Sequence, residues 1–194
     1  MLKTKSLHFA KTLAEKNIIN EDDIEIVSHG IIIGIRLCIN TLLTFMLGAV
    51  LGMAFESIFF IIMFSAVRSY AGGFHFKKPI FCYITSSCTI ITALLIAKSI
   101  PSHLIGLVGI ILLIISMIIL LSFAPVGTES KPLDNEEIFF FRKKVIRNSV
   151  IETISSIILF LLDFKVYSFI VVLAIALSAV LVVAQIIYGK LCYL

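Results

Sequence analysis

Long apolar runs separated by short polar connections occupy most of the 194-residue chain. The clearest run covers residues 103–124, the next covers 166–188, and a third covers 30–53. The hydrocarbon core of a bilayer is about 30 Å thick, so a helix needs about 20 apolar residues to cross it. Each of these runs is long enough, and the pattern predicts a helical membrane protein.

Three weaker runs complete the set: 54–69, 81–98 and 145–164. The first holds Glu56, the second is slightly short and carries several hydroxyl side chains, and the third holds Glu152. No polar loop separates the runs that meet at residue 53, so we expect a tight hairpin at 51–55. The pattern therefore predicts an all-α polytopic membrane protein with about six transmembrane helices.

The first 29 residues precede these spans and have a different pattern. Lys3, Lys11 and Lys16 alternate with apolar residues, which is typical of an amphipathic helix lying on a membrane surface. The alternative is a solvated, loosely ordered terminus. Glu-Asp-Asp at 21–23 follows Asn20 and predicts the capped start of a second short helix. We expect residues 1–29 to form an interfacial cytoplasmic segment and residues 30–194 to form a single transmembrane domain.

Composition and charge support this membrane assignment and add an orientation. The chain is 60% hydrophobic and 14% charged, whereas soluble domains average about 45–50% and about 25%. With the N-terminus inside the cell, only Lys98 and Lys165 fall in external turns, and Arg36 can snorkel to the cytoplasmic surface. Both termini and the connection at 68–82 are therefore predicted to be cytoplasmic. We expect no nucleic-acid partner.

The connection at 68–82, RSYAGGFHFKKPIFC, gathers reactive side chains between two apolar runs. A cysteine attacks as its thiolate, and a neighbouring histidine favours that form. His75 and Cys82 are seven residues apart, which is about 10.5 Å along a continuous helix, so they would not touch there. Gly72-Gly73 and Pro79 allow the helix to break. The sequence therefore predicts a turn followed by a new helix that starts near Pro79.

That arrangement would place Cys82 in the first turn of the new helix. The helix dipole and free N–H groups favour a thiolate there and can bind an acyl oxyanion. Lys77 and Lys78 add positive potential. The plainer interpretation is that His75 forms a structural hydrogen bond, that Cys82 packs, and that the two lysines contact lipid phosphate.

The other three cysteines fit structural roles. Cys38 and Cys192 are most simply buried small hydrophobic residues, and Cys88 lies deeper in its apolar run than Cys82. The four cysteines form no CxxC pair and no metal-type cluster with histidine. We therefore expect no metal.

The residues of this connection resemble the accessory gene regulator protein B (AgrB) family of membrane cysteine endopeptidases. The family pattern is an arginine, Ala-Gly-Gly, a histidine two residues later and a cysteine seven further on. This sequence matches at every point, and the stretch APVGTESKPL at 124–133, which includes Lys131, is similar to the family's loop after the fourth span. The matching residues are Arg68, Ala71, Gly72, Gly73, His75 and Cys82.

The resemblance implies that Cys82 is the nucleophile and His75 its base, with Arg68 and Gly73 needed in a less defined role. It implies a substrate of the AgrD type, a precursor peptide with an amphipathic leader, a pheromone segment and an acidic tail. Cys82 would release the tail, and the peptide's own cysteine or serine would capture the thioester as a cyclic thiolactone or lactone. The implied enzyme uses no metal or nucleotide cofactor and acts as a homodimer in the bacterial cell membrane.

Other charged residues have expected places around this reaction. The loop RKKVIR at 142–147 is a candidate docking surface for the acidic tail, or simply a positive-inside signal. Arg68 would hold a substrate carboxylate or a lipid phosphate, or belong to the architecture of the site. Candidates to orient His75 are Glu152, Asn148, Thr85 and Ser86, whereas Glu56 is expected to lie too far away. The docking surface includes Arg142, Lys143 and Lys144, with Lys77, Lys78 and Lys131 as further substrate-binding candidates.

Two other classes of function compete with the peptidase. A small transporter or peptide-export component would use a polar pathway marked by Arg36, Asn40, Glu56 and Glu152, with the Gly-Gly turn as a re-entrant element. A peptide-binding accessory would hold the substrate without any chemistry of its own. Replacement of Cys82 by alanine separates these classes from the enzyme.

Overall fold

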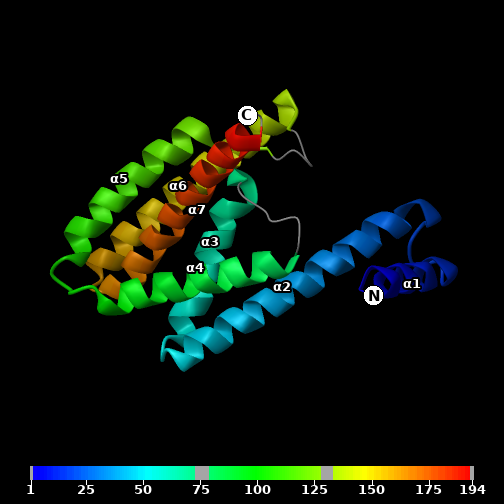
Figure 1. Cartoon of the computed structure of the whole chain (residues 1–194), viewed down its shortest axis with the longest axis horizontal. Helices are drawn as coiled ribbons and strands as arrows, with labels where there is room; N and C mark the ends of the chain where they lie inside the picture. The colour runs from blue at the N-terminus through cyan, green and yellow to red at the C-terminus, as the bar shows by residue number, and fades with distance from the viewer. Residues whose placement is uncertain (1, 73–78, 128–132, 193–194) are drawn as a thin grey trace. The chain divides into compact units, whose positions relative to one another are not determined.

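The structure is a computed structural model that describes residues 2–72, 79–127 and 133–192, with only the backbone described at 79–83 and 189–192. The described residues form helices and no strand, which confirms the predicted all-α class. Figure 1 shows their order along the chain. The α-helices are α1 Leu2–Glu15, α2 Ile24–Val50, α3 Ala54–Ala71, α4 Pro79–Ser99, α5 Ile105–Phe123, α6 Asn135–Leu161 and α7 Lys165–Cys192.

The chain divides into two compact units, one up to Leu43 and one from Thr44 onward. In the first unit α1 folds back on α2, and the hydroxyls of Ser6 and Ser28 lie 3.0 Å apart in a buried contact. The predicted N-terminal helix is confirmed, and its Phe9 is exposed, as an interfacial helix requires. Its position at a membrane surface stays a prediction.

The expected separate short helix at 21–23 was wrong in detail. Glu21–Asp23 form a single 3-10 turn that runs directly into α2, because Ile24 is already helical. The Asn20 side chain makes no capping bond to the backbone and instead donates to the Asp23 carboxylate at 3.4 Å.

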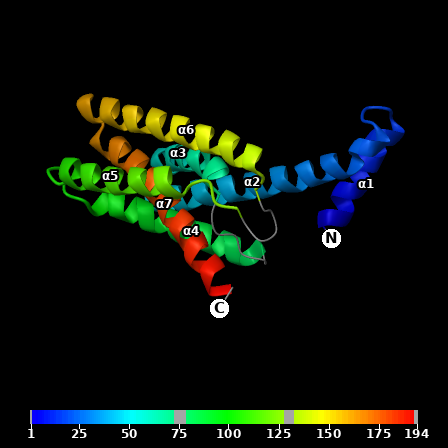
Figure 2. The same ribbon diagram turned by 90° about the horizontal axis from the view of Figure 1, so that it is seen from above.

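In the second unit α7 is the central helix, with α3, α5 and α6 packed along it and α4 crossing it (Figures 1 and 2). Helix α3 runs parallel to α7, since Phe59 stacks edge-on against Tyr167 and Val67 shares a core cluster with Ile175. Helix α6 runs antiparallel to α7, since Ser156 and Ser168 pair near their connecting turn. These directions agree with the alternating order predicted for spans that cross one membrane.

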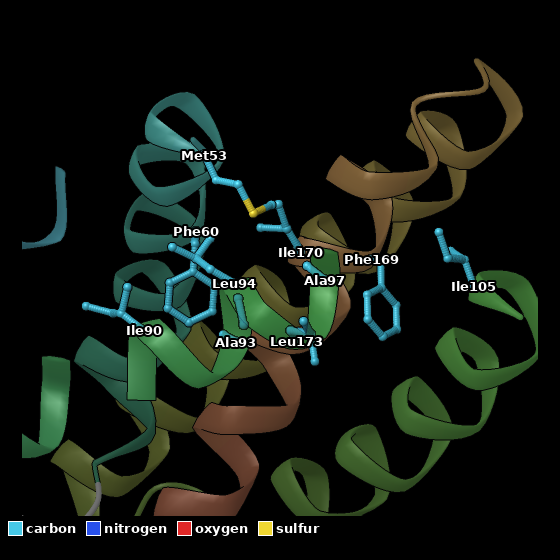
Figure 3. Packing of buried hydrophobic residues seen from close by; sticks show 11 residues of the cluster. Met53, Phe60, Ile90, Ala93, Leu94, Ala97, Ile105, Phe169, Ile170 and Leu173 are labelled. Atoms are coloured by element: carbon cyan, nitrogen blue, oxygen red, sulfur yellow. The ribbon is translucent and has the colours of Figure 1, made fainter. Parts of the chain in front are cut away.

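Two apolar clusters hold this unit together. The first contains Phe60 of α3, Leu94 of α4 and Phe169 of α7, and Figure 3 shows Phe60 beside Leu94. In the second, Val67 of α3 and Val145 of α6 pack on the later turns of α7. Side chains this deeply buried contribute about 1.5–3 kcal/mol each where burial removes them from water. The second cluster lies beside the end of α3, where the reactive connection begins.

The predicted hairpin at 51–55 is confirmed. Helix α2 ends at Val50 and α3 begins at Ala54, with Gly52 in the left-handed region at φ 72°. The Met53 N–H bonds to the Gly48 carbonyl at 2.7 Å and the Gly52 N–H to the Ala49 carbonyl at 3.0 Å. This bond pair is a Schellman motif, which satisfies the carbonyls at a helix end.

Four helical segments are long and apolar enough to cross a membrane: Glu21–Val50, Ala54–Ala71, Ile105–Phe123 and Lys165–Tyr188. The described part of α4 adds a shorter apolar helix, Ile84–Ser99. The expected span at 145–164 lies largely within α6, whose first half is basic and whose second half is apolar. The chain is therefore a polytopic helical membrane protein.

Candidate functional site

The predicted break between the second and third spans is present. Helix α3 ends at Ala71 and α4 begins at Pro79, so the backbone of Cys82 lies in the first turn of a new helix. The surroundings of the Cys82 side chain fall outside the described residues. So do Gly73, His75, Lys77 and Lys78, and the contact between His75 and Cys82 stays a prediction.

We call the predicted turn from Gly72 to Lys78 the reactive turn. Gly72 is its described residue, and the conformation of Gly72 requires glycine. Its backbone has φ 73° and ψ −161°, a combination that residues with a side chain rarely adopt. A Cβ placed on it would lie 3.1 Å from the carbonyl carbon of Val126 and closer still to the oxygen. The φ and ψ angles of Gly72 and the nearby Val126 carbonyl therefore both exclude a side chain at this position.

The segment that follows α5 lies directly against Ala71 and Gly72 at the end of α3. The Val126 N–H donates to the Ala71 carbonyl at 3.0 Å, and Gly72 and Val126 form an isolated parallel bridge. The Ala71 carbonyl is one of the orphan acceptors at the end of α3, and this bond satisfies it. We call residues 124–126 the strap. The rest of this loop, including Lys131, falls outside the described residues.

Arg68 also acts on the turn. Its guanidinium donates to the Gly72 carbonyl, four residues further along the chain. A charged donor at the C-terminal end of a helix also interacts favourably with the helix dipole. Arg68 was expected to hold a substrate carboxylate, to hold a lipid phosphate or to belong to the architecture of the site. This contact supports the third role.

Asn148 links α6 to the last turns of α3. Its Nδ2 donates to the Ala66 carbonyl at 2.6 Å, while its Oδ1 accepts from Nε and Nη2 of Arg147 at 3.3 and 3.2 Å. The sequence suggested Asn148 as an orienter of His75, and that role stays a prediction. The bond to Ala66 was missed, because nothing in the sequence pairs two residues so far apart.

Basic side chains gather on the first half of α6. Phe139, Arg142, Lys143, Ile146 and Arg147 line a hollow on the helix surface. One of them also ties α6 to its neighbour, since the Arg142 guanidinium donates to the Leu121 carbonyl at 3.0 Å. We call these five residues the basic face.

Lys144 is also on this half of α6 but points elsewhere. Its ammonium lies 5.2 Å from the ring centre of Phe140 and 6.0 Å from that of Tyr70, near the end of α3. At these distances a cation is attracted by the aromatic face. Lys144 therefore serves the packing of α6 on α3 more directly than the basic face.

The two glutamates of the predicted spans have different environments. Glu152 is 3% exposed on α6, as expected of a carboxyl that avoids lipid, and both its oxygens and the Ser149 hydroxyl have no hydrogen-bond partner among the described residues. Glu56 is in the first turn of α3, beside the Tyr167 hydroxyl. It lies at the opposite end of the helix from Gly72, and its separation from His75 stays a prediction.

Of the remaining candidates, Thr85 and Ser86 are half-buried on α4. The expectation that Cys38 is buried was wrong, because its side chain is exposed on α2. Cys88 is also exposed on α4, and for Cys192 the structure describes only the backbone. No group of three or more His, Cys, Asp or Glu side chains that would hold a metal is present in the described part of the chain.

The fold defines a class: a polytopic helical membrane protein in which α3 ends at Ala71 and a new helix, α4, starts at Pro79. Comparison with known proteins gives the family. The profile of the family described as Accessory gene regulator B matches residues 6–187, and the chain belongs to that family.

Two relatives come from Clostridium perfringens and are named as AgrB-like. One, from strain SM101, is 28% identical over 132 residues, and a second, from strain 13, is 31% identical over 133 residues. Each alignment covers 66% of this chain and 61% of the relative, so the match spans about three-fifths of the relatives' length. No solved structure matches the chain.

Proposed function

We propose that this protein is a membrane cysteine endopeptidase that processes a precursor peptide of the AgrD type into a cyclic quorum-sensing pheromone. The observation that carries the proposal is the helix break after Gly72, which starts α4 at Pro79 and puts Cys82 in its first turn. A thiolate at that position gains from the helix dipole and from free backbone N–H groups. Membership of the AgrB family supports the same reaction.

The reaction begins when the Cys82 thiolate attacks the carbonyl carbon of the last residue of the pheromone segment, in the peptide bond that joins it to the tail. The tetrahedral oxyanion is stabilised by the free N–H groups at the start of α4. The C–N bond then breaks, the His75 imidazolium gives its proton to the leaving amine, and the tail departs. The pheromone segment remains on Cys82 as a thioester.

In the second step the peptide's own thiol or hydroxyl attacks this thioester. His75 accepts the proton of the attacking group, the new thioester or ester bond closes the ring, and Cys82 leaves as a thiolate. Exchange between a thioester and a thiol conserves the acyl-transfer energy, whereas hydrolysis would lose it. A turn shielded at the membrane surface limits access of water to the intermediate.

The basic face of α6 supports recognition of the acidic tail. Arg142, Lys143 and Arg147 line one hollow on the helix with Phe139 and Ile146, which suits a peptide that carries both carboxylates and apolar side chains. We propose that the tail docks there, on the cytoplasmic side, in a homodimer embedded in lipid. Lys131, Lys77 and Lys78 are proposed as further contacts.

The deciding experiment compares Cys82→Ala with Cys88→Ala in proteoliposomes that contain the precursor peptide. Both variants remove one thiol from α4, and Cys88 is exposed six residues further along the helix. We expect loss of tail release and of the acyl adduct in Cys82→Ala alone. Tail release at the wild-type rate by Cys82→Ala would refute the peptidase.

A transporter is the second candidate, and Glu152 is the observation that favours it. A fully buried carboxyl without a hydrogen-bond partner among the described residues is typical of ion and proton pathways in membranes. Transport would survive Cys82→Ala and be abolished by Glu152→Gln. Flux of labelled peptide into vesicles distinguishes the two candidates.

A further inference from the structure

Three hydrogen bonds from different parts of the chain converge on the end of α3. Arg68 bonds to the Gly72 carbonyl, Val126 to the Ala71 carbonyl, and Asn148 to the Ala66 carbonyl. The first bond is local and the second comes from the strap. The third comes from α6, the helix that also carries the basic face.

We infer that Asn148 is a positioning residue of the reactive turn, and that it sets the register between the basic face of α6 and the end of α3. This inference rests on the proposed peptidase function. Asn148 does not reach the reacting atoms in this role. It acts through the last turns of α3, which determine the position of Gly72 and of the residues that follow.

The geometry of the amide supports a fixed link. Arg147 donates twice to Oδ1, and this assigns the other end of the amide, Nδ2, to the Ala66 carbonyl. A carbonyl has two lone pairs, so Ala66 can accept from Asn148 as well as from its own helix. The side chain is half-buried between the two helices, where a rotamer change would break both contacts.

The packing of α3 on α6 makes this link specific in register. The helices run antiparallel, since Tyr70 lies against Phe141, with ring centres 6.2 Å apart, and Ala66 lies against Asn148. Among the described residues, the contacts around them include Val67 with Val145, Tyr70 with Phe141 and the Lys144 ammonium with Tyr70. Apolar, aromatic and cation–π contacts of this kind tolerate small sliding movements. A directional bond from Asn148 fixes the position along the helix axis.

Arg147 gives this link a connection to the substrate. It lines the hollow of the basic face and at the same time holds the Asn148 amide. The side chains of Arg147 and Asn148 therefore link a tail docked on the basic face to the backbone of α3. The distance from the docked tail to the scissile bond is then set by a continuous path through Arg147, Asn148 and Ala66.

The test uses a series at one position. Asn148→Ala removes the donor, Asn148→Asp places a carboxylate against the Ala66 carbonyl, and Asn148→Gln keeps the donor on a longer side chain. A misplacement of about 1 Å lowers the rate of an enzyme by roughly 100-fold. We expect kcat for tail release to fall about 10- to 100-fold in Asn148→Ala and further in Asn148→Asp, with partial recovery in Asn148→Gln and KM within about twofold throughout.

Asn135 provides the matched control. It is exposed at the first position of the same helix, so Asn135→Ala and Asn135→Asp repeat the chemical changes away from α3. We expect wild-type kcat and KM in both. A rise in KM with unchanged kcat, equal losses at the two positions, or Asn148→Gln as impaired as Asn148→Asp would overturn the inference.

A second readout requires no substrate. In a background in which Cys38, Cys88 and Cys192 are serine, the rate of Cys82 alkylation by iodoacetamide is followed against pH. If Asn148 positions the turn, its loss separates the thiolate from its stabilising partners, and the alkylation profile moves to higher pH. An unchanged profile in Asn148→Ala refutes positioning, whereas cleavage that persists in Cys82→Ala refutes the peptidase itself.

Discussion

Replacement of Gly72 by alanine is the sharpest test of how the strap and the reactive turn depend on each other. The residue has φ 73° and ψ −161°, a backbone region that is essentially limited to glycine. For other residues this conformation is unfavourable by about 1–3 kcal/mol. The added methyl would also lie 3.1 Å from the Val126 carbonyl carbon, so the strap must move away.

Movement of the strap breaks the 3.0 Å bond from the Val126 N–H to the Ala71 carbonyl. Such a bond contributes about 0.5–1.5 kcal/mol. The two effects together amount to about 2–4 kcal/mol. Because α3, α5 and α7 are held by their apolar clusters, we expect this strain to displace the turn before it unfolds the bundle.

Gly52 is a matched control for this substitution. It also has a positive φ, 72°, but a Cβ there would meet no atom within 4 Å, and it lies at the other end of α3. Gly52→Ala therefore introduces strain in the backbone without a clash. We expect it to lower the thermal midpoint slightly and to leave tail release unchanged.

The assay measures tail release and the acyl adduct by mass spectrometry, together with thermal unfolding in detergent. A displacement that weakens the transition state by about 2–4 kcal/mol lowers the rate roughly 30- to 1,000-fold. We expect Gly72→Ala to lose activity on this scale while it still unfolds cooperatively. Activity in Gly72→Ala equal to that of Gly52→Ala would refute the reasoning.

Three further predictions follow from the same contacts. Val126→Pro removes the N–H that bonds to Ala71, so tail release should fall at least tenfold, with a far smaller loss in Val126→Ala; equal losses would contradict the role of the strap. Lys143→Glu should raise KM for a precursor with an acidic tail and weaken its dependence on salt, with kcat unchanged, as steady-state kinetics would show. Glu152→Met removes a buried carboxyl that has no hydrogen-bond partner among the described residues. The thermal midpoint of unfolding should therefore rise by an amount equivalent to about 1–3 kcal/mol. A lower midpoint would show that Glu152 has a partner in the native membrane.

The elements that sequence predicted well depend on local chemistry. The hairpin at 51–55 follows from two apolar runs with no polar loop and a glycine between them. The break at Ala71 and the restart at Pro79 follow from Gly-Gly and proline within one short stretch. Each of these features is encoded within about ten residues, and a single sequence is sufficient to find it.

The contacts that sequence did not predict join distant segments. Val126 reaches Ala71 across two helices, α4 and α5, and Asn148 reaches Ala66 across the same two. Hydropathy gives the length of a helix but not the face that it presents to a neighbour, and for this reason Cys38 was placed wrongly in the interior. Arg68 shows the same limit, since the sequence left a substrate carboxylate, a lipid phosphate and the architecture of the site open as its role, and the structure shows a bond to the nearby Gly72 carbonyl.

The bond between Val126 and Ala71 has a consequence for the biogenesis of the protein. A ribosome delivers Cys82 and His75 to the membrane well before it delivers the strap, because α4 and the whole of α5 are synthesised in between. A nascent chain that stops after α4 has both proposed catalytic residues. It lacks Val126, which pairs with Gly72 at the start of the reactive turn. The proposed activity is therefore expected to switch on only after α5 has been inserted, which would keep partly synthesised chains from acting on the precursor.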